Sequence, residues 1–256
     1  MLNIQNEINN RWSYSAKGYG NIIRDELSSF KTKAWIELIE TQIPKDKMLN
    51  ILDIGTGPGF FSIILTQAGY NVTGIDGSTE MIRQAKINAI GENINPTFKV
   101  MDSHFLDFPD NHFDVVLSRN VTWTLHNPIA AYKEWNRVLK PNGKLLIFDA
   151  NWHLHDYDKG LLRQVKERED KFRKKYGAPY DTYDGPQNEK GLKVELPLMS
   201  RKRPSWDNDV LSTVGFANIK NDLDITDRVW DEKEKLLYGA SPMFMITATK
   251  TIIGGQ

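Results

Sequence analysis

The chain has 256 residues, of which 40% are hydrophobic and 26% charged, proportions typical of a globular protein with a sizeable core. Its 33 basic and 33 acidic side chains cancel, whereas a chain whose main partner is a polyphosphate usually carries a basic excess. The absence of cysteine excludes disulfides, thiolate metal sites and a cysteine nucleophile. No apolar run reaches the roughly 20 residues of a membrane helix, and residues 1–20 lack a secretory pattern, so we expect a cytoplasmic protein.

The N-terminal segment, residues 1–44, comes before any strand pattern. It contains an aromatic stretch with Trp12, Tyr14 and Tyr19, and two glycines, Gly18 and Gly20, lie within it. We interpret this stretch as a flexible flap. Residues 22–43 predict one or two amphipathic helices that pack on a sheet.

Residues 45–150 alternate short apolar runs with helical stretches. This alternation is typical of βαβ units, in which helices cover both faces of a parallel sheet. A helix after the fourth run is well marked, because Asn127 can cap it, Pro128 suits its first position, and residues 140–143 end it. The predicted strands are residues 50–54, 71–75, 97–101, 114–118 and 144–149.

Beyond residue 150 the pattern changes. Residues 151–205, with a charged helix at 159–176 and a turn-rich stretch after it, predict a cap insertion at the sheet's edge. Residues 206–256 return to the sheet, with helices predicted at 206–214 and 227–237 and strands near 219–225 and 243–249. We therefore expect one α/β domain, a doubly wound, mostly parallel seven-stranded sheet with a helical N-terminal flap and a cap insertion after the fifth strand.

A glycine-rich turn, residues 53–60 (DIGTGPGF), joins the first predicted strand to a helix. Its glycines permit positive φ and allow a ligand to approach the backbone closely. The turn departs from the dinucleotide fingerprint, because the third glycine, Gly59, comes only two residues after the second. Pro58 also removes an amide donor where a phosphate would need one. The turn therefore suits a nucleoside without phosphates better than a nicotinamide dinucleotide.

Further motifs follow this turn in order. Asp76 ends the second predicted strand, Ser78 and Met81 open the next helix, and Asp102-Ser103 follows the third strand. The stretches LDFPDNHFDVVLS (106–118) and RVLKPNGKLLIF (137–148) complete the series. Over residues 45–150 the sequence resembles the class I S-adenosylmethionine-dependent methyltransferases, which have a Rossmann-like fold.

The resemblance implies that S-adenosylmethionine is bound and S-adenosylhomocysteine is the product. It implies that Asp76 accepts both ribose hydroxyls, and that Asp102 accepts the adenine amine while the next amide meets the ring. We expect the donor's carboxylate to be met by Tyr14, Tyr19 or Arg119. The remaining cofactor-binding residues that we predict are Asp53, Gly55, Thr56, Gly57, Gly59, Gly77, Ser78, Met81 and Ser103. The glycines could instead serve only a tight turn, and either aspartate could be a simple cap.

Two tryptophans are predicted to contact the substrate. Trp123 follows the fourth strand and Trp152 follows the fifth, and ligands of open α/β sheets bind beyond the carboxyl ends of the strands. Packing inside the cap is the alternative for each. The candidate general bases in the same region are His126, His153, His155 and Asp149.

A divalent metal is a further alternative for this region. His153 and His155 would share a face of an extended segment, with Asp149 and Asp156 nearby. The spacing is not diagnostic, however, and rim residues of a pocket explain it equally well. We predict no metal.

The acceptor is expected to be a small molecule. Amino-methyltransferases acting on DNA bases carry a D/N-P-P-aromatic motif after the fourth strand, where this chain has SRNV (118–121). A neutral chain with an aromatic and charged insertion fits a metabolite, cofactor or natural product held under its own cap, without nucleic acid or membrane, in a monomer or homodimer. The alternatives are an RNA methyltransferase, a non-catalytic nucleoside-binding protein and, disfavoured by Pro58 and Gly59, a nicotinamide dehydrogenase.

Overall fold

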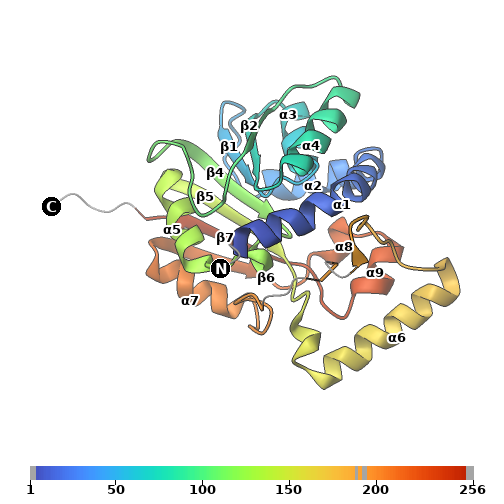
Figure 1. The fold of residues 1–256 in the computed structure, drawn as a ribbon. Coiled ribbons are helices and arrows are strands. Elements are labelled where there is room, and N and C mark those ends of the chain that lie inside the picture. Colours follow the sequence, from blue (N-terminus) through green and yellow to red (C-terminus); the bar gives the residue numbers. More distant parts are fainter. Residues whose placement is uncertain (1–3, 188–189, 192–194, 252–256) are drawn as a thin grey trace.

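The fold is a single seven-stranded sheet with helices on both faces, as a computed structural model of residues 4–187, 190–191 and 195–251 shows (Figure 1). The strand order is β3-β2-β1-β4-β5-β7-β6, and β7 is antiparallel to both of its neighbours while the other pairs are parallel. This confirms the predicted fold class. The strands are β1 (Asn50–Ile54), β2 (Asn71–Asp76), β3 (Thr97–Val100), β4 (Phe113–Arg119), β5 (Leu139–Asp149), β6 (Phe216–Asp222) and β7 (Phe244–Lys250).

Helices separate the strands in chain order. The longer ones are α1 (Ile4–Leu27), α2 (Lys31–Glu40), α3 (Phe60–Gln67), α4 (Thr79–Gly91), α5 (Pro128–Val138), α6 (Lys159–Tyr176) and α7 (Ser205–Thr213). Short turns of helix are η1 (Thr122–Thr124), η2 (Leu154–Asp156), α8 (Thr226–Val229) and α9 (Glu232–Tyr238). Within the described residues, no helix is both long and apolar enough to span a bilayer.

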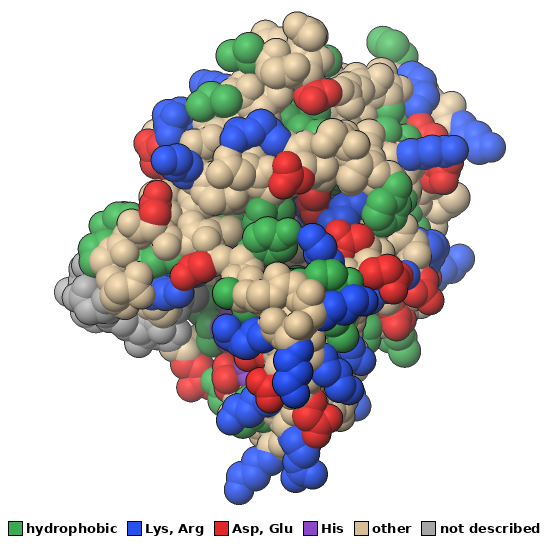
Figure 2. Space-filling model, turned by 90° about the vertical axis from the view of Figure 1, so that its right-hand side faces the viewer, with side chains coloured by type: hydrophobic (Ala, Val, Ile, Leu, Met, Phe, Trp, Pro, Cys, Tyr) green, Lys and Arg blue, Asp and Glu red, His purple; other side chains and the backbone are tan. Residues whose placement is uncertain are grey.

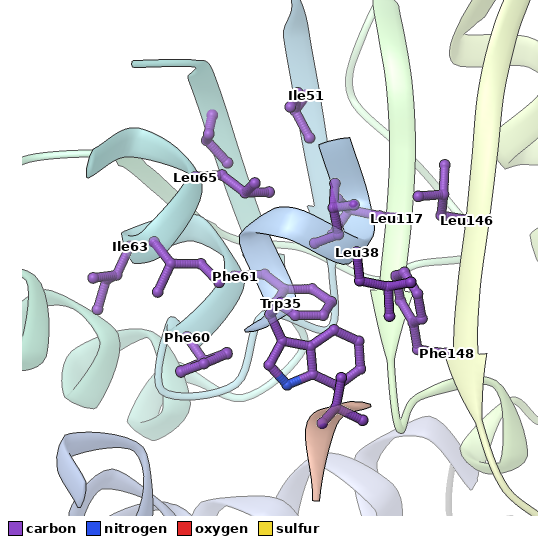
Figure 3. Packing of buried hydrophobic residues seen from close by; sticks show 14 of the residues in the cluster. Trp35, Leu38, Ile51, Phe60, Phe61, Ile63, Leu65, Leu117, Leu146 and Phe148 are labelled. Atoms are coloured by element: carbon purple, nitrogen blue, oxygen red, sulfur yellow. The ribbon is translucent and has the colours of Figure 1, made fainter. Parts of the chain in front are cut away.

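Alternating side chains of each central strand enter two separate cores. In β1, Ile51 packs with α2 and α3, while Leu52 packs on the opposite side with α5 and α7. Successive strand residues point to opposite faces, so both sets are apolar in a sheet covered on both sides. Figure 3 shows the first core, in which the Trp35 ring of α2 meets Phe61 and Phe148 edge-on with ring centres 5.0 Å apart in each case.

Residues 4–27 form one continuous helix, α1, so the aromatic stretch that we expected as a flap ahead of the helices is itself helical. Gly18 and Gly20 lie inside this helix because two neighbours approach their backbone closely. A Cβ on Gly18 would lie 2.7 Å from Thr182, and one on Gly20 would lie 2.7 Å from Gln84 Oε1. The glycines therefore permit close packing of α1 rather than loosening it.

Two C-terminal elements differ from the prediction, one in where it begins and one in its continuity. Strand β6 begins at Phe216, directly after Gly215 in a positive-φ conformation, rather than near residue 219. The helix predicted at 227–237 is divided into α8 and α9. Asp231 causes the division, because its side chain accepts the amides of Lys233 and Glu234 and so starts a new helix.

The insertion after β5 carries α6, which packs on α9 and extends away from the sheet (Figure 1). Asp158 caps α6 by accepting the amides of Gly160 and Leu161. On the face that lies to the right in Figure 1, acidic and basic side chains alternate over the surface (Figure 2). The insertion thus lies beyond the carboxyl ends of the parallel strands, over the place where ligands bind in such sheets.

Candidate functional site

The glycine turn after β1 is built from three residues with positive φ: Gly55 (64°), Gly57 (53°) and Gly59 (94°). A Cβ on Gly55 would lie 2.3 Å from Val121 Cγ2, so the turn passes directly beneath the loop that follows β4. Gly57 faces open space. A Cβ on Gly59 would lie 3.1 Å from Ala85 Cβ of α4, so this glycine permits close packing of the scaffold.

Three amides of this turn donate hydrogen bonds within the protein. Thr56 N donates to Ile75 O (2.8 Å), Gly57 N to Asp76 Oδ2 (3.0 Å) and Gly59 N to Thr56 O (2.9 Å). Pro58 has no amide hydrogen. A dinucleotide site needs amides that point at its pyrophosphate, so this arrangement does not fit a diphosphate.

Asp53 lies beneath the turn and holds it to α3. Its Oδ2 accepts from Thr56 Oγ1 (2.6 Å), Ser62 N (3.0 Å) and Ser62 Oγ (2.8 Å). Burial raises the pKa of the Asp53 carboxyl. Its contacts give this first acidic residue of the motif a structural role in shaping the turn.

A cavity of about 160 Å³, here called the turn cavity, opens where β1, β2 and β4 end. Asp76 lies on its wall, and burial raises the pKa of this carboxyl to about 6. Its Oδ1 also accepts Ser78 N at 2.8 Å. The predicted cofactor residues that line the turn cavity are Tyr19, Asp53, Gly55, Thr56, Gly57, Asp76, Gly77, Met81, Ser103 and Arg119.

Two predicted cofactor residues act beside this cavity. The Ser78 hydroxyl caps α4 by accepting Met81 N (3.2 Å) and lies 2.8 Å from Ser13 Oγ of α1. Asp102 Oδ1 accepts His104 N (2.9 Å) and lies 2.7 Å from His104 Nδ1. Met101 and Ser103, rather than Asp102, reach the cavity wall.

Tyr14 is directed away from the turn cavity. Its ring meets Tyr183 edge-on at 5.5 Å, and its main-chain oxygen accepts Asp184 N. Tyr14 therefore joins α1 to the insertion. Tyr19, one heptad away from Trp12, does face the cavity, and burial raises the pKa of its phenol.

Helix α1 supplies a face of cavity residues that the sequence reasoning missed. Gln5, Ile8, Asn9 and Trp12 line the turn cavity together with Tyr19 and Ile23. Their spacings of three, four and seven residues are those of one helical face. This helical spacing is visible in the sequence, but the interpretation of the stretch as a flap left it unused.

A second cavity of about 620 Å³, the aromatic cavity, adjoins the first. It is enclosed by α1 and α2, the loops after β4 and β5, the insertion, and α8 and α9. Five of the seven tryptophans of the chain line it. Its ten aromatic side chains are Trp12, Tyr19, Phe30, Trp35, Trp123, Trp152, Phe172, Tyr180, Trp230 and Tyr238. Both tryptophans predicted to contact substrate, Trp123 and Trp152, are among them.

The two cavities share a wall made of Trp12, Tyr19, Ile23, Arg119 and Asn120. The Arg119 guanidinium, predicted to meet the donor's carboxylate, pairs with Glu26 Oε2 at 2.8 Å. It also lies 4.5 Å above the Phe60 ring. Ion pairing and stacking thus fix Arg119 at the junction of the cavities.

Asp149 does not suit the role of general base predicted for it. Its Oδ1 accepts Ala150 N and Trp152 Nε1, each at 2.9 Å. Its Oδ2 accepts Trp123 N (3.1 Å), Thr122 Oγ1 and Arg203 Nη1 (2.9 Å). The side chain is fully buried, so no lone pair is left for a substrate proton. Asp149 instead orients the two tryptophans.

Of the predicted histidines, His153 lines the aromatic cavity, whereas His126 and His155 line neither cavity. His126 Nδ1 lies 3.1 Å from Gln5 Oε1, its ring centre lies 3.9 Å from that of His104 with the planes inclined by 37°, and burial lowers the pKa of His126. His153 lines the aromatic cavity, where its ring lies 4.8 Å from Trp123 and its Nδ1 lies 3.2 Å from Asp156. Within the described residues, no group of three His, Asp or Glu could hold a metal.

The chemistry of the turn cavity fits an adenosine thioether. A carboxylate, Asp76, is placed to accept sugar hydroxyls, and Met81 and Met101 offer apolar, polarisable surface to a purine. The amides of Thr56, Gly57 and Gly59 are bonded within the protein and are not free for a diphosphate. The part of the turn cavity nearest the aromatic cavity is bordered by aromatic rings, which attract a cation.

Comparisons with known proteins agree with this geometry. Residues 52–147 match a family model described as "Methyltransferase domain". Phosphoethanolamine N-methyltransferase 3 of Arabidopsis thaliana is 34% identical over 119 residues, covering 46% of this chain and 24% of that protein. The 2-methyl-6-phytyl-1,4-hydroquinone methyltransferase of Synechocystis is 34% identical over 125 residues, covering 46% of this chain and 39% of that protein. The chain thus spans less than half the length of these two relatives.

Solved structures share the fold over more of the chain. Phosphoethanolamine N-methyltransferase 2 of Haemonchus contortus, in complex with S-adenosyl-L-methionine, superposes with a TM-score of 0.60 at 18% identity, covering 85% of this chain and 52% of that one. The ordered motifs, the seven-stranded sheet and the methyltransferase domain match together lead to one assignment. Residues 52–147 are a methyltransferase domain, and most of the chain shares the fold of a methyltransferase solved with S-adenosyl-L-methionine.

Proposed function

We propose that this chain transfers a methyl group from S-adenosylmethionine to a small-molecule acceptor bound in the aromatic cavity. The observation that carries the proposal is the shared wall, through which two cavities of different chemistry meet at Trp12, Tyr19 and Arg119. A donor in the first cavity and an acceptor in the second would meet there. The relatives named for phosphoethanolamine and for a hydroquinone, both small molecules, support this choice.

The role of the protein in such a transfer is mainly positioning. S-adenosylmethionine, when bound, supplies a methyl group activated by a sulfonium. Asp76 would hold the sugar hydroxyls, and the α1 face would cover the nucleoside and exclude water. Ring faces of Trp12 and Tyr19 at the shared wall would attract the positive charge by about 0.5–2 kcal/mol.

The direct test is binding. S-adenosylmethionine and S-adenosylhomocysteine should each raise the melting temperature, since a ligand at 100 times its dissociation constant adds about 2.7 kcal/mol to the free energy of unfolding. NAD should not. A shift with NAD alone would overturn the proposal in favour of a dehydrogenase.

The acceptor cavity is tested by Trp152→Ala. This variant should reduce methyl transfer at least tenfold, while the affinity for S-adenosylhomocysteine changes less than about twofold, because Trp152 lines only the aromatic cavity. Equal losses of both would make Trp152 part of the scaffold. Binding that weakens steeply with added salt in the presence of RNA would instead favour an RNA acceptor.

A further inference from the structure

Several rings of the aromatic cavity are inclined steeply to one another, whereas Trp152 and Trp230 are inclined by 34° with centres 6.2 Å apart. Trp152 and Tyr238 are perpendicular (90°) with centres 5.6 Å apart, and Trp230 is inclined 62° to Tyr238 at 5.9 Å. On the other side, Trp12 and Trp123 are inclined 73° at 6.0 Å. Steeply inclined rings can surround a rounded ligand group from several directions. A planar aromatic ligand would instead need a slot between parallel rings. Steeply inclined rings are typical of sites that recognise alkylated ammonium groups.

The cations at the floor of the cavity are already paired. Lys31 Nζ lies 3.2 Å from Glu26 Oε1 and 2.7 Å from Glu234 Oε1. Arg119 Nη2 lies 2.8 Å from the other Glu26 oxygen. These four side chains form a neutral, largely buried network. An anionic group such as a phosphate could be bound there only by breaking ion pairs, which is costly in a buried place.

One lining cation stands outside this network among the described residues. Lys233 lies in the first turn of α9, and its Nζ is 5.5 Å from the centre of the Tyr176 ring on α6. Two lining carboxylates, Asp25 and Asp231, are not paired with a cation in any described ion pair. The cavity therefore offers aromatic faces and carboxylates to a cation, but a single lysine to an anion.

We infer that the acceptor is an amine without a phosphate group, whose methylated product is an ammonium cation held by the rings of Trp152, Trp230 and Tyr238. This inference rests on the proposed function. The neutral amine nitrogen forms a bond to the methyl carbon with its lone pair, and the carbon–sulfur bond breaks with its electron pair left on sulfur. The positive charge passes from sulfur to nitrogen. A tertiary amine needs no general base for this step, in keeping with a fully bonded Asp149.

The test compares choline with its uncharged carbon isostere, 3,3-dimethylbutan-1-ol, by calorimetry on protein saturated with S-adenosylhomocysteine. Choline should bind at least about tenfold more tightly, because only the charge differs. Phosphocholine should bind at least about tenfold more weakly than choline, since its phosphate finds no free cation cluster. Equal affinities of choline and the isostere, or no binding of choline, would overturn the inference. Tighter binding of phosphocholine than of choline would overturn the part of the inference that excludes a phosphate group from the acceptor.

Substitutions of Tyr238 test whether the preference for choline over its isostere depends on the aromatic rings. Tyr238→Leu should reduce the preference for choline over the isostere at least about threefold, whereas Tyr238→Phe, which keeps the ring, should retain it within about twofold. Trp206→Leu is the matched control, because Trp206 packs in the α7 core away from both cavities. A loss of preference in Trp206→Leu equal to that in Tyr238→Leu would contradict the assignment. Failure of S-adenosylhomocysteine to bind the unmodified protein is a separate result, which refutes the proposed function itself.

Discussion

Arg203 Nη1 lies 2.9 Å from Asp149 Oδ2, and both side chains are essentially inaccessible to solvent. The same guanidinium donates to both oxygens of Asp207, which also accepts the Tyr132 hydroxyl. This pair fastens the insertion's end to the last residue of β5. Through Asp149, it also fixes the loops that carry Trp123 and Trp152.

Removing this guanidinium should destabilise the protein strongly. In Arg203→Ala, two buried carboxylates lose their cation, and breaking such a pair costs about 3–5 kcal/mol. The measurement is the free energy of unfolding from urea titration. Arg83→Ala is the control, since its ion pair with Glu80 is exposed and should contribute less than about 0.5 kcal/mol. Equal effects of the two substitutions would contradict the role given to Arg203.

Asp76→Ala should weaken the binding of S-adenosylhomocysteine by more than about tenfold, because the bidentate acceptor for the ribose is lost. Calorimetry measures this directly. Asp107→Ala, an exposed carboxylate outside the turn cavity, controls for the loss of one negative charge. Unchanged affinity in Asp76→Ala would refute the assignment of Asp76 to the sugar.

Binding of S-adenosylhomocysteine should depend on pH near 6. Burial raises the pKa of Asp76 to about 6, so the carboxyl is partly protonated there in the free protein. Hydroxyl donors of a bound ribose stabilise the carboxylate and lower this pKa, so protons are released on binding and affinity rises as pH increases through 6. Calorimetry at pH 6 in buffers of different ionisation enthalpy should detect the protons released on binding. At pH 8 this proton release should vanish. Equal affinity at pH 5 and pH 8 would count against it.

The glycine turn offers a matched pair of substitutions. Gly57→Ala should cost about 1–2 kcal/mol of unfolding free energy, the penalty of a positive φ, because open space surrounds a Cβ there. Gly55→Ala should cost at least about 1 kcal/mol more, since its Cβ would meet Val121. Adding Val121→Ala to Gly55→Ala should recover part of that excess, as a double-mutant cycle would show. Additive effects of the two substitutions would place the clash elsewhere.

Local patterns in the sequence predicted the central fold well. The βα alternation placed β1 at its observed bounds, and Asn127 and Pro128 marked the start of α5, where the Asn127 side chain accepts Ala130 N. Such signals depend on neighbours a few residues apart. The turn-cavity residues at the strand ends, such as Gly57 and Asp76, followed from ordered motifs for the same reason, since each motif occupies the end of one strand.

Long-range contacts could not be predicted in this way. The role of Asp149 is set by Arg203, 54 residues further along, and nothing near Asp149 in the sequence indicates that partner. The close packing of α1 depends on the approach of Thr182 and Gln84 to its glycines, which lie far from them in the sequence. Trp230 and Tyr238 enter the aromatic cavity only because α8 and α9 fold back onto α2 and α6.

Helix α1 forms a wall of both cavities, through Asn9 in one, Glu26 in the other, and Tyr19 in each. The turn cavity and the aromatic cavity are consequently covered by the same helix. A rigid shift of this helix would expose donor and acceptor together, so exchange of spent donor and departure of product would be coupled in time.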